Sequence, residues 1–206
     1  MKVYCIRHGE SEANLDPSVY LEKNDHNIDL SKKGREQSIK AGHDLHKEIG
    51  KGDRRVIIFY SPYERTKQTM EHIKKGLNQR HFDVDGMVVC HPSPIIREQE
   101  YKVFEDSNDS EAKREEMVRF GKYWYRFKNA ESMADVFGRA MTFYNYLVNK
   151  VQFGAINPEE DIVVVVSHCG FLKNLRGVCE GTDVDHIQDD IINNAKIFEI
   201  DLLKKI

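Results

Sequence analysis

Four consecutive valines, residues 163–166, constrain the fold of this chain more than any other feature of its sequence. A strand with one wet face alternates apolar and polar side chains, whereas a strand covered on both faces shows no such alternation. Residues 161–167 (DIVVVVS) therefore predict a central strand that is buried on both faces. Such a strand needs an apolar layer above and below its sheet, and helices are the usual cover.

Three further segments rich in Val, Ile, Phe and Tyr predict strands at residues 2–6, 56–61 and 87–91, and residues 197–202 are a candidate fifth strand. Helical patterns lie between them, at residues 31–49, 62–77, 132–151 and 170–178. Strands that alternate with helices indicate a largely parallel sheet. We therefore expect an α/β fold, a three-layer α/β/α sandwich with a mostly parallel central sheet and helices on both faces.

The length of 206 residues suits one compact domain over residues 1–206. Two stretches depart from the strand and helix alternation, residues 16–30 and residues 98–129. We interpret both as insertions that lie over one end of the sheet, above the active site.

Composition narrows the classes of function. The formal net charge of -3 gives no basic field for nucleic acid, and no apolar run approaches the roughly 20 residues of a membrane span. The N-terminus lacks the apolar core and cleavage site of a signal peptide, which predicts a cytoplasmic protein without a membrane partner. The sequence leaves the oligomeric state open, and a homodimer is one option.

The residues that directly follow the strands are the candidates for a site, because ligands of open parallel sheets bind beyond the carboxyl ends of the strands. Charged, imidazole and thiol side chains follow four of the predicted strands: Arg7, His8, Arg65, Glu98, His168 and Cys169.

This set of side chains suits the transfer of a phosphoryl group. The group carries negative charge on its oxygens, so catalysis depends on positioned positive charge and hydrogen-bond donors. Arg7 and Arg65 can clamp phosphate oxygens, and His168 can donate a further hydrogen bond. A neutral imidazole attacks through one nitrogen when an acceptor holds the other, which suits His8. Glu98 is the candidate acid that protonates the leaving oxygen and then deprotonates water.

The segments RHGESEAN, SPYERTKQT, IRE and VVVSH occur in this order, and together they resemble the histidine phosphatase superfamily, in the branch with cofactor-dependent phosphoglycerate mutases and fructose-2,6-bisphosphatase. The resemblance implies that His8 is the nucleophile and Glu98 the proton donor. It also implies a phosphate pocket with these members: Arg7, Arg65, His168 and, as an additional contact, Asn14.

Two more stretches, REQEY at residues 97–101 and FGKYWYRFKNAESMADVFGR at residues 120–139, are similar to a subgroup of broad-specificity acid phosphatases. The R-H-Y-G segment usual in the mutases is missing, which favours hydrolysis over mutase activity. Cys169 stands where the family normally has the glycine of S-H-G, so it is expected to line the phosphate pocket. The resemblance predicts a phosphatase for small phosphorylated metabolites with no metal and no organic cofactor.

Several alternatives compete with this interpretation. The chain could be a phosphoglycerate mutase-type phosphotransferase, or a catalytically silent protein that binds phosphorylated ligands.

Cys169 followed by Arg176 resembles the C-x5-R loop of cysteine phosphatases, but six residues intervene, which would rotate the arginine by about 100° on a helix. His43 and His46 lie three residues apart on a helical pattern and could in principle bind a metal, but Lys40 and Lys47 lie close by, which favours an exposed pair. The aromatic residues at 120–127 predict either core packing or a lid over the substrate.

Overall fold

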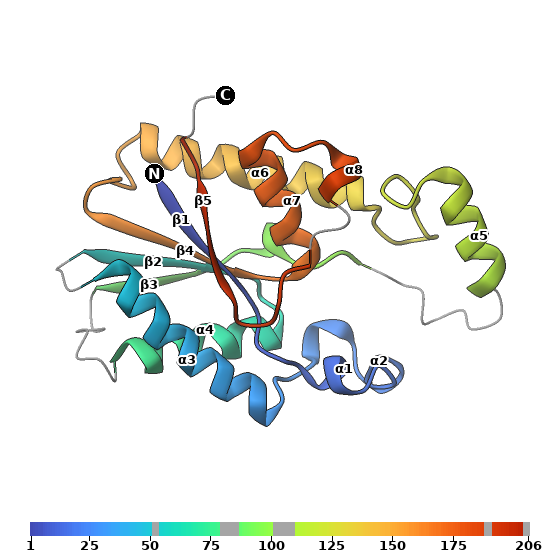
Figure 1. Cartoon of the computed structure of the whole chain (residues 1–206), viewed down its shortest axis with the longest axis horizontal. Coiled ribbons are helices and arrows are strands. Elements are labelled where there is room, and N and C mark those ends of the chain that lie inside the picture. Colours follow the sequence, from blue (N-terminus) through green and yellow to red (C-terminus); the bar gives the residue numbers. More distant parts are fainter. Residues whose placement is uncertain (51–53, 79–86, 101–109, 188–190, 204–206) are drawn as a thin grey trace.

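A five-stranded sheet forms the centre of the computed structural model, which describes residues 1–50, 54–78, 87–100, 110–187 and 191–203 (Figure 1). Its spatial order is β3-β2-β4-β1-β5. The first four strands in the chain run parallel to one another, and β5 runs antiparallel to β1. The strand bounds are β1 (Lys2–Arg7), β2 (Arg55–Tyr60), β3 (Val88–Pro92), β4 (Asp161–Ser167) and β5 (Ile197–Asp201).

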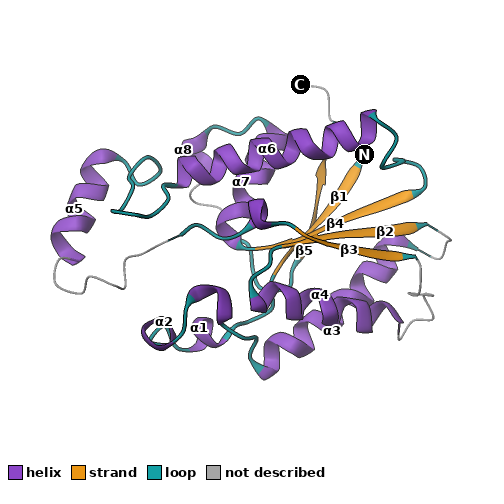
Figure 2. Cartoon of the chain, turned by 180° about the vertical axis from the view of Figure 1, so that it is seen from behind, coloured by secondary structure: helices purple, strands orange, loops and turns teal. Residues whose placement is uncertain are grey.

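Helices cover both faces of the sheet, as Figure 2 shows. On one face lie α3 (Lys32–Ile49) and α4 (Glu64–Asn78), and on the other lie α6 (Met133–Gln152) and α7 (Cys169–Glu180). Successive residues of β4 pack into opposite cores, with Val163 and Val165 on the α6 and α7 side and Val164 on the α3 and α4 side. All seven residues of β4 are buried. The expected three-layer sandwich is confirmed, and so are the four long helices and the fifth strand.

Local sequence signals fix where these helices begin and end. The hydroxyl of Ser31 accepts a hydrogen bond from the Gly34 amide and caps α3. Ser132 and Asp135 form a reciprocal capping box at the start of α6. At the end of α7, Gly181 adopts φ of 67°, in the left-handed region that glycine tolerates best. These helix boundaries thus follow from residues that lie at each helix end or within one turn of it.

The described parts of the two predicted insertions lie beyond the carboxyl ends of the strands (Figure 1). The short helices α1 (Glu12–Leu15), α2 (Val19–Glu22) and η1 (Asp25–Asn27) precede Leu30, which is buried and bridges to Ser11. The second insertion follows η2 (Pro94–Ile96) and contains α5 (Ser110–Phe120). Its middle, residues 101–109, falls outside the described residues.

The aromatic residues at 120–127 divide between the core and the surface. Tyr123 is 1% exposed and donates a hydrogen bond of 2.8 Å to Asn174 Oδ1, so it belongs to the core. Phe120 and Trp124 are 67% and 61% exposed. The group is therefore neither wholly core nor wholly surface.

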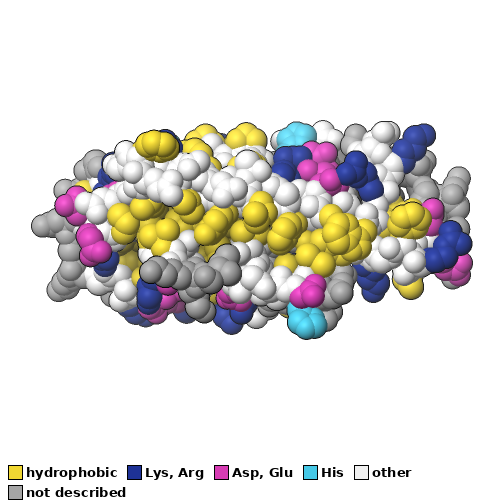
Figure 3. All heavy atoms as spheres, turned by 90° about the horizontal axis from the view of Figure 1, so that it is seen from above, with side chains coloured by type: hydrophobic (Ala, Val, Ile, Leu, Met, Phe, Trp, Pro, Cys, Tyr) yellow, Lys and Arg dark blue, Asp and Glu magenta, His cyan; other side chains and the backbone are white. Residues whose placement is uncertain are grey.

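The outer surface of the α6 layer is also partly apolar. Figure 3 views the molecule from this side and shows a band of hydrophobic side chains along it. Partly exposed apolar residues on α6 include Phe137, Met141, Tyr144 and Val148. The short helix α8 (Val184–Ile187) belongs to the same layer. No helix in the described ranges is long and apolar enough to cross a membrane.

Candidate active site

The carboxyl ends of three neighbouring strands bring the predicted site residues together. His8 donates its amide to the carbonyl of Ser167 at 2.9 Å, and the Ser61 amide donates to the carbonyl of Val166 at 3.0 Å. The loops after β1, β2 and β4 therefore start side by side. The rings of His8 and His168 lie edge to face with centroids 5.2 Å apart.

The geometry of His8 leaves one ring nitrogen ready to react. Its ring is 4% exposed, and Nδ1 lies 2.7 Å from the carbonyl oxygen of Gly9. Because a carbonyl only accepts hydrogen bonds, Nδ1 must carry the hydrogen and Nε2 keeps the lone pair. Burial, followed by the charges of Arg65 and Arg7, lowers the pKa of His8 well below its ordinary value. The imidazole is therefore neutral near pH 7, which a nucleophile requires.

Arg65 is a buried cation in the first turn of α4, only 3% exposed. Its Nη1 donates to the backbone carbonyl of Asp25 at 2.6 Å and lies 2.8 Å from Asp25 Oδ1. The guanidinium also lies over the ring of Tyr63, 5.0 Å from its centroid. The first insertion, which carries Asp25, thus holds this arginine at the strand ends.

Arg7 and His168 each carry a buried nitrogen that has no hydrogen-bond partner within the described part of the chain, Arg7 Nε and His168 Nδ1. The other contacts of these side chains are firm: Arg7 Nη1 donates to the Ile192 carbonyl at 2.7 Å, and His168 Nε2 lies 2.9 Å from Ser61 Oγ. Burial and then the charge of Arg65 lower the pKa of His168 well below its ordinary value. Buried polar atoms are normally satisfied, so these two nitrogens suit an anionic ligand.

Glu98 reaches the site from an irregular segment after η2. Its Oε2 accepts a hydrogen bond from the amide of Gly170 at 3.2 Å, in the first turn of α7, and its Oε1 accepts from the Gln99 amide at 3.0 Å. The structure does not pair Glu98 with Arg97, because Arg97 contacts Glu100 at 3.1 Å instead. The carboxyl group therefore lies at the start of the helix that follows His168.

Asn14 contacts the loop that carries the candidate nucleophile His8 (residues 8–11, here called the nucleophile loop) through another asparagine. Its side chain is exposed, and Oδ1 accepts hydrogen bonds from the Ser11 amide and from Asn194 Nδ2, both at 3.1 Å. The same Asn194 Nδ2 donates to the His8 carbonyl at 3.0 Å. The structure thus brings Asn14 to the edge of the site.

Sequence reasoning missed Asn194 and its neighbours. The Ala195 amide donates to the carbonyl of Arg7 at 3.0 Å, and Ala195 adopts a positive φ of 54°. Together with the Ile192 carbonyl, this segment fixes the backbone and side chain of Arg7. No local motif could have revealed it, since these contacts join residues more than 180 positions apart.

Cys169 is the first residue of α7, directly after His168, and its side chain is partly buried. Arg176, its partner in the cysteine-phosphatase alternative, lies two turns further along the same helix, about 10 Å away at 1.5 Å per residue. Arg176 pairs with Glu180 at 3.1 Å. The two side chains are therefore not arranged as a phosphate loop.

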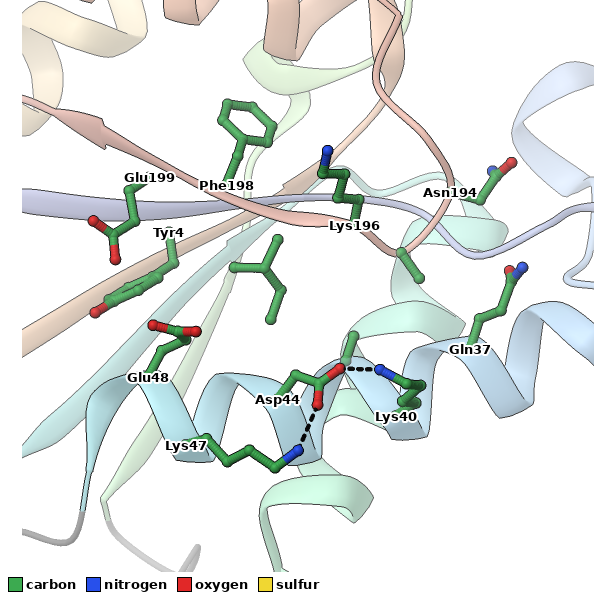
Figure 4. Close-up of a pocket in the computed structure, with 13 residues that line it drawn as sticks. Tyr4, Gln37, Lys40, Asp44, Lys47, Glu48, Asn194, Lys196, Phe198 and Glu199 are labelled. Atoms are coloured by element: carbon green, nitrogen blue, oxygen red, sulfur yellow. Dashed lines mark hydrogen bonds and ion pairs between the residues drawn. The ribbon is translucent and has the colours of Figure 1, made fainter.

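A pocket of about 720 Å³ lies behind the nucleophile loop, between α3 and β5 (Figure 4). Its lining has both charges, with Lys40 and Lys47 bound to Asp44. Gln37, which also lines it, accepts a hydrogen bond from the Glu10 amide at 2.9 Å. Gln37 thus connects the lining of this pocket to the nucleophile loop, and none of the predicted site residues lines the pocket.

Two histidines, His43 and His46, were the candidates for a metal site. Among the residues that the structure describes, no three His, Cys, Asp or Glu side chains gather into a group that could hold a metal ion. His43 and His46 lie in the C-terminal half of α3, with His46 in its last turn.

Proteins with similar sequences include phosphoglycerate mutase-like proteins and a phosphatase. The phosphoglycerate mutase-like proteins AT74 and AT74H of Arabidopsis thaliana are 34% and 31% identical over 174 and 177 residues, and each match covers 81% of this chain. The matches span only 54% and 61% of the plant proteins. The broad-range acid phosphatase DET1 of Saccharomyces cerevisiae is 22% identical, over 81% of this chain and 74% of the yeast protein.

Solved structures show the same fold. Bacillus stearothermophilus YhfR superimposes with a TM-score of 0.70 at 20% identity, covering 97% of this chain and 90% of the other. A mycobacterial glucosyl-3-phosphoglycerate phosphatase superimposes with a TM-score of 0.69 at 17% identity, covering 96% and 90%. The family model for the histidine phosphatase superfamily (branch 1) matches residues 3–205. The chain therefore belongs to branch 1 of the histidine phosphatase superfamily.

Proposed function

We propose that this protein is a phosphatase that hydrolyses small phosphomonoesters through a phosphohistidine formed on His8. The observation that carries the proposal is the 2.7 Å contact between His8 Nδ1 and the Gly9 carbonyl, which leaves Nε2 with its lone pair. Burial of the ring, followed by the charges of Arg65 and Arg7, lowers its pKa and keeps it neutral. A neutral nucleophile beside positive charge suits attack on a phosphate monoester.

In the first step, His8 Nε2 attacks phosphorus and forms the P–N bond while the bond from phosphorus to the ester oxygen breaks. The proton of Glu98 goes to the leaving oxygen, so the alcohol departs neutral. Arg7, Arg65 and His168 bind the phosphoryl oxygens, whose charge their buried donors match. Asn14 and Cys169 are assigned to the rim of the same pocket.

In the second step, the Glu98 carboxylate takes a proton from water. The water oxygen bonds to phosphorus, the P–N bond breaks, and inorganic phosphate leaves with His8 restored. No metal ion or organic cofactor enters either step. The broad-range acid phosphatase activity named for the yeast relative supports this assignment.

Trapping experiments test the nucleophile. After a brief incubation with a ³²P-labelled phosphomonoester and an alkaline quench, the protein should carry acid-labile phosphate on His8. His8→Ala should abolish both label and turnover, whereas Cys169→Ser, which keeps a small side chain at the rim of the pocket, should still form the label. Full turnover in His8→Ala, with loss in Cys169→Ser, would reject the histidine mechanism.

A mutase is the second candidate, because a 2,3-bisphosphoglycerate-dependent phosphoglycerate mutase of Bartonella bacilliformis is 27% identical over 88% of this chain. Incubation with 3-phosphoglycerate separates the two. A phosphatase releases inorganic phosphate, whereas a mutase accumulates 2-phosphoglycerate. A catalytically silent binding protein would bind phosphate and release neither product.

A further inference from the structure

Arg139 of α6 binds the backbone on both sides of Arg97, in and just before the segment that carries Glu98 (residues 97–100, here called the Glu98 segment). Its Nη1 donates to the carbonyls of Ile95 at 2.7 Å and Arg97 at 2.9 Å, and Nη2 donates to the Glu98 carbonyl at 3.3 Å. The segment from Arg97 to Glu100 has no helix or strand of its own. Its course therefore depends on side chains that bind its backbone.

Glu131 holds the guanidinium of Arg139 and the same segment together. Its two oxygens accept from Arg139 Nε at 3.0 Å and Nη2 at 2.8 Å. They also accept from Arg97 Nη2 at 2.7 Å and the Glu100 amide at 3.2 Å. The carbonyl of Glu131 accepts from Gln99 Nε2 at 2.8 Å. Both charged side chains are largely buried, at 13% and 15% exposed, so solvent screens the pair only weakly.

Arg139 also touches the helix that receives the Glu98 carboxyl. Its guanidinium lies 5.9 Å from the ring centroid of Phe171, the residue after Gly170. The Gly170 amide is the donor that holds Glu98 Oε2. One side chain thus contacts both the backbone that carries the carboxyl group and the helix that anchors it.

We propose that Arg139, oriented by Glu131, is a positioning residue that holds Glu98 as the proton donor at the phosphate pocket. The proposal rests on the proposed function, because it gives Arg139 a role only through Glu98. A planar fork with several donors is required, since three carbonyls and a carboxylate are bound at once. Lysine has one nitrogen and cannot reach them together.

The test compares leaving groups in the first turnover, measured by rapid quench. An alkyl phosphate such as β-glycerophosphate needs a proton on its leaving oxygen, whereas 2,4-dinitrophenyl phosphate does not. Arg139→Lys should slow phosphorylation by β-glycerophosphate about 10-fold to 100-fold and leave phosphorylation by 2,4-dinitrophenyl phosphate within about 3-fold. Glu131→Gln should show the same selectivity to a smaller degree. Arg126→Lys is the matched control, because Arg126 pairs with Asp135 at the surface and contacts no part of the Glu98 segment in the described structure.

A double variant makes the test independent of folding. If Arg139 acts through Glu98, Arg139→Lys should add little to the loss already caused by Glu98→Gln. Equal slowing of both substrates by Arg139→Lys, or losses that multiply in the double variant, would overturn the proposal. Failure of the proposed function itself appears in a different arm, as first-turnover phosphorylation that survives in His8→Ala.

Discussion

The carboxylate of Glu98 occupies the space that a side chain at Gly170 would need. A Cβ atom placed on Gly170 would lie 2.3 Å from Glu98 Oε1, far inside contact distance. The obstructing atom is the end of a flexible side chain rather than backbone, so the carboxyl group can swing away. Glycine at this position therefore serves the placement of Glu98 more than the packing of α7.

Gly170→Ala should consequently lower activity with little loss of stability. The displaced carboxyl group loses its hydrogen bond to the 170 amide, so we expect kcat for alkyl phosphates to fall by about 10-fold to 100-fold. The free energy of unfolding should change by less than about 1 kcal/mol, because alanine also favours the helix. Steady-state kinetics and urea titration measure the two effects. A large stability loss with unchanged kcat would contradict this account.

Gly138→Ala is the matched control for the same exchange. Gly138 lies within α6, and no atom outside its local backbone lies within 4 Å of a Cβ built there. We expect unchanged kcat and a gain in stability of about 0.5–1 kcal/mol from helix propensity.

Gly9→Ala should differ from Gly170→Ala in its effect on stability. A Cβ at Gly9 would lie 2.3 Å from the backbone carbonyl oxygen of Gly34, which cannot swing aside. Either the start of α3 or the nucleophile loop must shift, so we expect about 1–3 kcal/mol of destabilisation together with a loss of activity. Thermal unfolding of the variant, compared with Gly138→Ala, measures the difference. A Tm within 1 °C of wild type would contradict the predicted close contact.

The sequence was sufficient to predict the layers and the meeting of the residues that follow the strands, because both depend on short-range patterns. The valines at 163–166 required a strand covered on both faces, and β4 is one. Ser31 and Ser132 marked helix starts through caps that act within three residues. The residues after parallel strands had to meet at one edge of the sheet, which brought His8 and His168 together.

The sequence contained no comparable pattern from which contacts between distant segments could be predicted. Asp25 binds Arg65 from an insertion with no regular pattern, and Asn194 binds the His8 carbonyl from 186 positions away. The antiparallel direction of β5 also could not be read, because strand patterns do not encode orientation. Arg139 was part of a recognised stretch, but its partners became visible only in three dimensions.

Asn194→Ala should weaken the nucleophile loop. The substitution removes the donor to the His8 carbonyl and the link to Asn14, and each neutral hydrogen bond contributes about 0.5–1.5 kcal/mol. We expect kcat/KM to fall by about 5-fold to 20-fold, with His8 still phosphorylated. Asn193→Ala is the neighbouring control, since that side chain is exposed. Equal activity of the two variants would show that the contacts of Asn194 do not matter.

The buried histidines should also make stability depend on pH. Burial and the nearby arginines lower the pKa of His8 and of His168, so both rings stay neutral in the folded protein below pH 6.5. The unfolded chain, with ordinary histidine pKa values of about 6.5, takes up these protons as the pH falls. Because the unfolded state binds more protons, the free energy of unfolding must decrease from about pH 6.5 downward.

Each of these two histidines should contribute a slope of up to about 1.4 kcal/mol per pH unit between pH 6.5 and 5, where few carboxylates titrate. Urea titrations at several pH values, without phosphate or sulfate that could occupy the pocket, measure this slope. His8→Gln and His168→Gln should each flatten it. Equal slopes in wild type and both site variants would mean that these rings are protonated in the folded protein, and the neutral nucleophile would have to be abandoned.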